Sequence, residues 1–139
     1  MYEIIPHLYL SNYRDVVNSL DKESDFFVMN CTKDLPMVQT KYGGTRLFVD
    51  DHPSSENTMT MNISLMVKYI DDQLKKGHNV VVHCFAGQQR SAAVVAAYLV
   101  DKMNMTVDQA IDFIKSKKPD AFLGGVHFIK SIKNTVDEK

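Results

Sequence analysis

Hydrophobic residues recur along the chain with two spacings, and these spacings predict short strands alternating with longer helices. Five apolar runs are short and bounded by turn residues, as strands are. The most apolar is NVVVH at residues 79–83. Continuous β-branched runs suit burial on both faces of a sheet, so we expect this strand to be central. The predicted strands cover residues 3–5, 8–10, 26–30, 46–49 and 79–83.

Helical spacing dominates the remaining segments. Apolar residues recur every three or four positions from Ile63 to Leu74, and Gly77 is expected to end that helix. Thr106 and Gln109 have the spacing of a capping box, which predicts a helix that begins there and stops before Pro119. Further helices are predicted over residues 12–20, 91–103 and 122–136. This order of elements indicates an α/β fold in which helices flank a small central sheet.

Composition and charge exclude several classes of protein. The chain has 139 residues, 45% of them hydrophobic, which suits one compact domain over residues 1–139. With 16 basic and 17 acidic residues the formal charge is −1, so no polyanion-binding surface is indicated. No run approaches the roughly 18 apolar residues that span a membrane, and MYEIIPHLYL does not resemble a signal peptide. Two cysteines, Cys31 and Cys84, make no disulfide framework, and we expect a cytoplasmic or nuclear protein with reduced thiols.

Chemistry is concentrated in NVVVHCFAGQQRSAA, residues 79–93, where a buried strand ends at a cysteine and an arginine opens a helix. A sharp turn between them would point backbone N–H groups inward, beside the positive end of the helix dipole, and this arrangement binds anions. Arg90 would add a planar fork that matches two phosphate oxygens, and the same positive field would stabilise the thiolate of Cys84. The predicted phosphate loop consists of Phe85, Ala86, Gly87, Gln88, Gln89 and Arg90.

A plainer interpretation of this segment is a buried cysteine and an ordinary surface arginine. Free cysteine is among the most buried residue types, so either residue alone would favour that interpretation. The combination of an apolar strand, His-Cys, a glycine and Arg-Ser at a spacing of five residues favours a phosphate-binding nucleophile instead.

HCFAGQQRS resembles the H-C-x5-R-S/T signature of the cysteine-dependent protein tyrosine phosphatases. Four further stretches resemble the dual-specificity branch in its compact, atypical type, and they follow one another in that family's order. The sequence departs from the family pattern at Gln89, where a small residue usually precedes the arginine, and at Ala92, which replaces a frequent glycine. The four stretches are IIPHLYLSNYRDV, FFVMNCT, LFVDDHP and, more loosely, PDAFLGGVHFIKSI.

The resemblance implies a protein tyrosine phosphatase-like fold with a mixed sheet, and a hydrolase that needs no metal or other cofactor. Its substrates would be proteins phosphorylated on tyrosine and on serine or threonine. Cys84 would form a phosphocysteine while Arg90 holds the phosphate oxygens, and Ser91 would donate a hydrogen bond to the Cys84 sulfur. Phosphate or another oxyanion is therefore the expected occupant of the loop. Membrane and nucleic-acid partners are not expected.

The resemblance also implies a general acid among the residues of LFVDDHP. In family members, apolar residues stand two and four positions before the aspartate that acts as the acid. Asp51 follows Val49 and Leu47 at those distances, whereas Asp50 follows Phe48 and Arg46. We therefore expect Asp51 to be the acid and keep Asp50 as the alternative, with two solvated loop aspartates as the plainer interpretation.

Two residues beside the predicted loop have structural and functional interpretations. His83 precedes the nucleophile on a strand, so we expect its side chain on the opposite face, orienting the loop rather than acting as a base. Cys31 follows the strand at residues 26–30, where some phosphoinositide-directed relatives carry a cysteine that bonds reversibly to the nucleophile. We expect Cys31 to be a small core side chain, with the redox bond to Cys84 as the alternative.

Other activities within and beyond the superfamily are alternatives to a protein phosphatase. A phosphoinositide phosphatase would be expected to carry lysines where the loop has Gln88 and Gln89. An RNA 5′-phosphatase would need clustered Lys and Arg, which a nearly neutral chain lacks. A non-catalytic phosphoprotein-binding module would be expected to lack Cys84, Arg90 or the acid, and all three are present.

Overall fold

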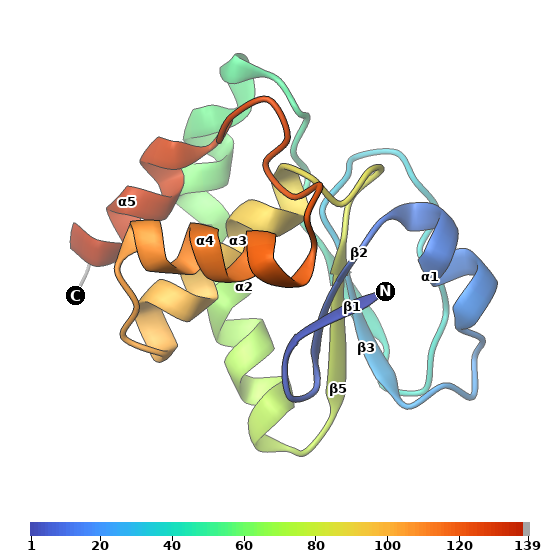
Figure 1. The fold of residues 1–139 in the computed structure, drawn as a ribbon. Coiled ribbons are helices and arrows are strands. Elements are labelled where there is room, and N and C mark those ends of the chain that lie inside the picture. Colours follow the sequence, from blue (N-terminus) through green and yellow to red (C-terminus); the bar gives the residue numbers. More distant parts are fainter. Residues whose placement is uncertain (138–139) are drawn as a thin grey trace.

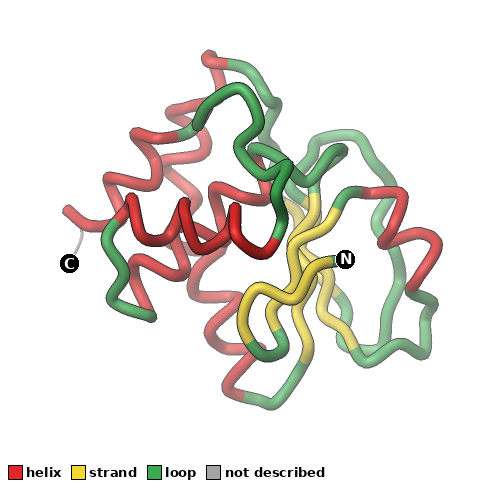
Figure 2. The backbone as a smooth tube through the Cα atoms, in the orientation of Figure 1, coloured by secondary structure: helices red, strands yellow, loops and turns green. Residues whose placement is uncertain are grey.

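Residues 1–137 are described by the computed structural model, which places a twisted sheet between helices (Figure 1). Figure 2 shows that the strands meet in the middle of the molecule and that loops connect them to the helices at both ends. The elements in chain order are β1 (Tyr2–Ile5), β2 (Leu8–Ser11), α1 (Tyr13–Ser19), β3 (Phe26–Asn30), β4 (Gly44–Arg46), the short 3₁₀ helix η1 (Pro53–Ser55), α2 (Glu56–Lys75), β5 (Asn79–His83), α3 (Arg90–Lys102), α4 (Val107–Lys117) and α5 (Ile129–Asp137).

The sheet has the strand order β1-β2-β5-β3-β4, in which β1 is antiparallel to β2 and the other neighbours are parallel. This confirms a mixed sheet with residues 79–83 at its centre. The four parallel strands end in register, because Ser11 and Asn30 both pair with His83, and Arg46 pairs with Asn30. The segments that leave these strands therefore start at one edge of the sheet, where ligands of open α/β sheets bind.

The valines of β5 alternate between the two faces of the sheet. Val80 and Val82 belong to the main core, which helices α2 to α5 cover on one side (Figure 1). Val81 belongs to a smaller cluster with Val16 of α1 and Val28 of β3 on the opposite side. Burial on both faces explains why this strand is apolar throughout, and it makes β5 a rigid support for the residues that follow it.

The predicted strand at residues 46–49 was wrong in its position, because β4 covers only Gly44–Arg46. The apolar alternation that suggested it is real, since Leu47 and Val49 are buried while Phe48 is 62% exposed. However, β4 is an edge strand whose partner, β3, ends at Asn30. Within residues 1–137 no strand pairs with the chain beyond Arg46, and the N–H of Val49 donates instead to the carbonyl oxygen of Leu47 over 3.0 Å.

The predicted helix at residues 122–136 was also wrong in its start, because α5 begins at Ile129. Phe122, Gly124 and Gly125 all have positive φ, at 58°, 82° and 113°. Right-handed helices cannot contain such residues, so the chain turns repeatedly before α5 begins. We call residues 118–128 the connecting segment, and it matters for the site described below.

The other helix predictions agree with the structure within a few residues. Thr106 and Gln109 form both hydrogen bonds of a capping box, and α2 is followed by Gly77 with a positive φ of 80°. α2 starts at Glu56, seven residues before the apolar repeat that predicted it.

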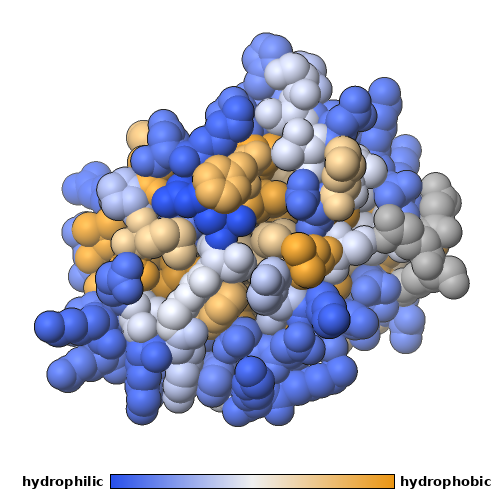
Figure 3. Space-filling view, turned by 180° about the vertical axis from the view of Figure 1, so that it is seen from behind, coloured by the Kyte–Doolittle hydropathy of each residue, from blue (hydrophilic) through white to orange (hydrophobic). Residues whose placement is uncertain are grey.

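The face in Figure 3 is largely hydrophilic, with hydrophobic side chains gathered near its middle. No helix among residues 1–137 is both long and apolar enough to cross a bilayer.

Candidate active site

Cys84 lies directly after β5, at the edge where the parallel strands end, and only 2% of its surface is exposed. Its sulfur lies 3.1 Å from the hydroxyl oxygen of Ser91, in the first turn of α3. The sequence predicted this contact. The strand, the loop and the helix start therefore bring a thiol and a hydroxyl together beneath the residues 85–90.

Gly87 seats the loop on the end of β2. Its φ is 71°, and a Cβ at this position would lie 2.6 Å from the carbonyl oxygen of Ser11. Nearby, the backbone N–H of Tyr13 donates to the carbonyl oxygen of Phe85 over 3.0 Å. The loop thus needs a residue without a side chain at its point of closest approach.

Replacing Gly87 with alanine is expected to lower the free energy of unfolding by about 2 kcal/mol or more, because the left-handed conformation alone costs roughly 1–2 kcal/mol and the clash with Ser11 adds to it. Urea denaturation measures the change. Gly77→Ala is a matched control, since Gly77 has a φ of 80° but no atom within 4 Å of the added Cβ. Equal losses in the two variants would show that the contact with Ser11 has no energetic consequence.

Arg90 opens α3, and its guanidinium reaches from the loop to the segment that carries the two candidate acids. Nη1 donates to the carbonyl oxygen of Val49 over 3.2 Å. Nε is buried and has no hydrogen-bond partner among residues 1–137. The side chain therefore holds one main-chain oxygen and keeps at least one buried donor unpaired.

Asp50 and Asp51 have different neighbours. The Asp50 carboxylate forms an ion pair with Lys33 over 2.9 Å. Oδ1 of Asp51 lies 2.9 Å from Nδ1 of His127, and both line a cavity of about 190 Å³ together with His52 and Pro53. Only Asp51 is thus linked to a segment that also contacts the phosphate loop.

The two glutamines of the loop contact the connecting segment, which the sequence did not predict. Nε2 of Gln89 donates to the carbonyl oxygens of Leu123 and Gly125 over 3.1 and 2.8 Å. Its Oε1 accepts from the backbone N–H of His127 over 3.0 Å. Nε2 of Gln88 donates to Asp120 over 3.2 Å, and the main-chain carbonyl oxygen of Gln88 accepts from the N–H of Phe122 over 2.8 Å.

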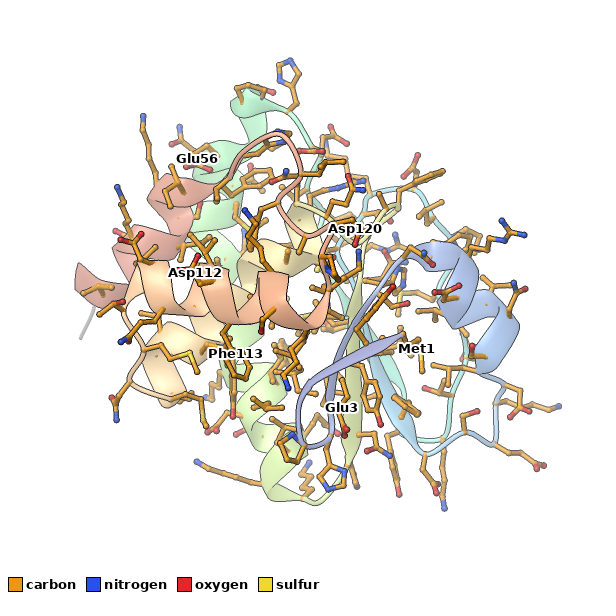
Figure 4. The ribbon with its side chains drawn as sticks, in the orientation of Figure 1. Met1, Glu3, Glu56, Asp112, Phe113 and Asp120 are labelled. Carbon is orange, nitrogen blue, oxygen red and sulfur yellow. The ribbon has the colours of Figure 1, made fainter. Side chains whose placement is uncertain are left out.

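Lys118 and Asp120 fix the start of the connecting segment. Lys118 is almost completely buried, and its Nζ lies 2.5 Å from Oδ1 of Asp120. In Figure 4, Asp120 lies beyond the end of α4, next to the loop that follows β5. Burial acts to raise the pKa of Asp120, but hydrogen bonds from Lys118 and Gln88 outweigh it, so the pKa lies below its usual value.

His83 and Cys31 are both fully buried beside the loop. Nδ1 of His83 lies 3.1 Å from the carbonyl oxygen of Cys84, which agrees with the predicted orienting role. Burial lowers the pKa of His83, so the neutral imidazole is favoured. Burial, and then the charge of Cys84, raise the pKa of Cys31 well above its usual value, which suits an inert core thiol. The redox bond to Cys84 stays the alternative, which the structure does not test.

The catalytic domain of the dual-specificity phosphatases is the family whose model matches the chain, over residues 8–137. Dual specificity protein phosphatase 9 from Homo sapiens is 34% identical over 121 residues, which cover 84% of this chain and 31% of that protein. The chain thus spans about a third of the length of this curated relative.

Solved structures of two related phosphatases have the same fold. Human DUSP28 superposes with a TM-score of 0.83 at 19% identity, covering 99% of this chain and 96% of that one. A mouse putative dual specificity phosphatase, solved in complex with zinc tungstate, also gives 0.83 at 21% identity, covering 99% and 86% of the two chains. From the family match and the 34% identity, the chain belongs to the dual-specificity phosphatase family.

Proposed function

We propose that the chain is a protein phosphatase that hydrolyses phosphomonoesters of tyrosine and of serine or threonine. The observation that carries the proposal is the position of the Cys84 sulfur, 3.1 Å from the Ser91 hydroxyl, between a buried strand and the start of α3. Cys84 would be the nucleophile, Arg90 the phosphate clamp and Asp51 the general acid and base.

In the first step the Cys84 thiolate attacks phosphorus, so that an S–P bond forms as the bond to the ester oxygen breaks. The departing oxygen takes a proton from the Asp51 carboxyl group. Arg90 and the backbone N–H groups of the loop would hold the other three oxygens as charge develops on them. The products of this step are a phosphocysteine and the free hydroxyl group of the protein substrate.

In the second step the Asp51 carboxylate takes a proton from water, whose oxygen attacks the phosphocysteine. The P–S bond breaks, phosphate leaves, and Cys84 returns to the thiolate. Ser91 can donate its hydroxyl proton in a hydrogen bond to the sulfur as negative charge returns there. The position of Ser91 supports this role for it.

The unpaired donor of Arg90 supports phosphate as the occupant of the loop. A buried N–H without a partner costs about 1–3 kcal/mol, and a phosphate oxygen would offset that cost. The mouse relative was solved in complex with zinc tungstate, in which tungstate is a tetrahedral oxyanion like phosphate. An oxyanion held by Arg90 and the loop N–H groups is consistent with both observations.

A protein substrate fits the surroundings of the loop. A cavity of about 460 Å³ adjoins it and is lined partly by Tyr13, Phe85 and Gln88. Phe85 and Ala86 are exposed, so residues that flank a phosphorylated side chain could contact them. No lysine lies within residues 85–90, and recognition of several phosphates at once would normally use clustered basic residues.

Replacing Asp51 with asparagine tests the assignment of the acid. We expect turnover of a phosphoserine peptide to fall by about 10²–10⁴-fold, because an alkoxide leaves poorly without a proton. The loss should be much smaller for 4-nitrophenyl phosphate, whose leaving group is stable as an anion. The measurement is kcat/KM for each substrate, because this ratio reports the steps up to formation of the phosphocysteine and excludes the second step, which the two substrates share.

Asp50→Asn is the matched control, since Asp50 is the neighbouring carboxylate but pairs with Lys33. It should retain turnover of both substrates within about three-fold, as expected for a surface ion pair. If Asp50→Asn shows the selective loss on phosphoserine and Asp51→Asn does not, the acid is Asp50 and the assignment made above is wrong.

A further inference from the structure

The connecting segment, residues 118–128, is held at both of its ends. At its start, the buried Lys118 pairs with Asp120. Just beyond its end, the carboxylate of Glu56 accepts from the backbone N–H of Lys130 over 3.0 Å and lies 3.2 Å from the hydroxyl of Ser131. Figure 4 shows Glu56 at the start of α2, next to α5. Because Gln88 also donates to Asp120, the segment is fixed to the phosphate loop near its start and to α2 just beyond its end.

Gln89 fixes the middle of the same segment from inside the protein. Only 4% of this residue is exposed. Its amide uses two donor bonds and one acceptor bond, to the carbonyl oxygens of Leu123 and Gly125 and to the N–H of His127. Three main-chain groups on five consecutive residues cannot shift without breaking these bonds, so Gln89 determines where the backbone of His127 lies.

The side chain of His127 continues this chain of contacts to the proposed acid. Its Nδ1 lies 2.9 Å from Oδ1 of Asp51, on a segment 76 residues away in the sequence. In Figure 1 the connecting segment arches between the loop after β5 and the segment before α2. A continuous set of hydrogen bonds thus runs from the residue preceding Arg90 to Asp51.

We propose that His127, held in place by Gln89, is a positioning residue that orients the Asp51 carboxyl group for proton transfer. The inference rests on the proposed role of Asp51 as general acid. Nδ1–H of His127 donates to Oδ1, whether Asp51 is ionised or carries its proton on Oδ2. This bond fixes rotation of the carboxyl group and leaves Oδ2 free to give its proton to the departing oxygen.

Geometry explains why such a bond matters although both side chains are partly exposed. An acid works only within hydrogen-bond reach of the oxygen that it protonates, and a displacement of about 1 Å can reduce a rate by roughly 10²-fold. The hydrogen bond from Arg90 to the segment of Asp51 goes to the main chain of Val49 and not to a side chain. Among residues 1–137, His127 is the residue that forms a hydrogen bond with the Asp51 carboxylate itself.

This arrangement also explains the departure at Gln89 from the small residue that usually precedes the arginine in this family. A serine or alanine there could not reach Leu123, Gly125 and His127 together. In this chain the buried side chain of Gln89 thus connects the phosphate loop with the residue that contacts the proposed acid.

The test compares His127→Ala, His127→Asn and Gln89→Ser with the intact protein on a phosphoserine peptide and on 4-nitrophenyl phosphate. Without the positioning bond, we expect kcat/KM, which reports the first step, to fall by about 10–100-fold on phosphoserine in His127→Ala and by less than about three-fold on the activated ester. His127→Asn should recover most of the loss, since its amide can donate to Oδ1. Gln89→Ser should show the same selectivity for the poor leaving group.

His78→Asn is the control for replacing a histidine, because His78 stacks on Tyr42 and bonds Gln73 instead. It should change neither substrate's kcat. Thermal unfolding of each variant checks that the fold is retained, and Gln89→Ser still provides the test if His127→Ala fails to fold. The inference would be overturned if His127→Ala and Gln89→Ser lost activity equally on both substrates, or if neither variant lost activity.

Combining His127→Ala with Asp51→Asn separates failure of the inference from failure of the proposed function. If Asp51 is the acid and His127 acts through it, the double variant should be no slower on phosphoserine than Asp51→Asn alone. An additive loss would overturn the inference and leave the acid in place. If Asp51→Asn itself lacks a leaving-group effect, the proposed acid is wrong and the role of His127 falls with it.

Discussion

Replacing Cys84 with serine is expected to reduce turnover of every phosphomonoester by about 10⁴-fold or more. A hydroxyl is a much weaker acid and nucleophile than a thiol, and an alkoxide is a poor leaving group in the second step. The variant should keep its fold, because serine is slightly smaller than cysteine and Ser91 can still contact it. Single-turnover assays with a phosphotyrosine peptide measure the loss.

Two further measurements make this prediction specific to the nucleophile. Rapid acid quench of the intact protein should trap phosphate on Cys84, and the serine variant should trap none on that time scale. Cys31→Ala is the matched control, since Cys31 is the other buried thiol and belongs to the same core. It should keep kcat within a few-fold at a temperature where it remains folded. Full activity of Cys84→Ser with loss of activity in Cys31→Ala would contradict the proposal and make Cys31 the nucleophile.

Local pattern was enough to predict the part of the fold that supports the site. Three consecutive valines can be buried on both faces only in an inner strand, so the position of β5 follows from Val80, Val81 and Val82. The contact between Cys84 and Ser91 was expected from the resemblance to the phosphatase signature, and the two atoms lie 3.1 Å apart. Only the position of β5 was derived from the local pattern itself.

One of the two errors arose where an element depends on a distant neighbour, and the other where a local signal was overlooked. Residues 47–49 alternate like a strand, yet pairing stops at Arg46 because β3 has already ended at Asn30. The pattern of one segment contains no information on the length of its partner. The late start of α5 had a local signal in Gly124-Gly125, since two adjacent glycines favour turns over helix.

His127 could not be found as a site residue from the sequence. It lies 76 residues from Asp51, and a lone histidine before a helix has no chemical signature of its own. Gln89 was recognised as unusual but not explained, because its three partners lie in residues that were expected to be helical. A buried amide needs hydrogen-bond partners, and long-range packing decides which ones it finds.

Replacing Arg90 with lysine is expected to lower kcat/KM by about 10³-fold, or roughly 4 kcal/mol of transition-state stabilisation. Arg90 has several fixed donors, of which Nη1 already serves the carbonyl oxygen of Val49 and the buried Nε remains for a phosphate oxygen. A lysine has one compact ammonium group that cannot replace both contacts in a planar arrangement. Steady-state kinetics with a phosphotyrosine peptide measure the loss.

The loss in Arg90→Lys should divide between binding and chemistry, because the guanidinium would contact the phosphate before and during the reaction. Competitive inhibition by inorganic phosphate should weaken, since product binding reports the ground-state part. Arg46→Lys is the matched control, because Arg46 also donates to main-chain carbonyl oxygens, those of Thr32 and Leu35, but within residues 1–137 has no hydrogen bond to the loop. It should cost stability while leaving kcat/KM of the folded protein nearly unchanged. Unchanged phosphate inhibition in Arg90→Lys would mean that the oxyanion is held by the loop N–H groups alone, and that Arg90 serves to anchor Val49 and the segment of Asp51.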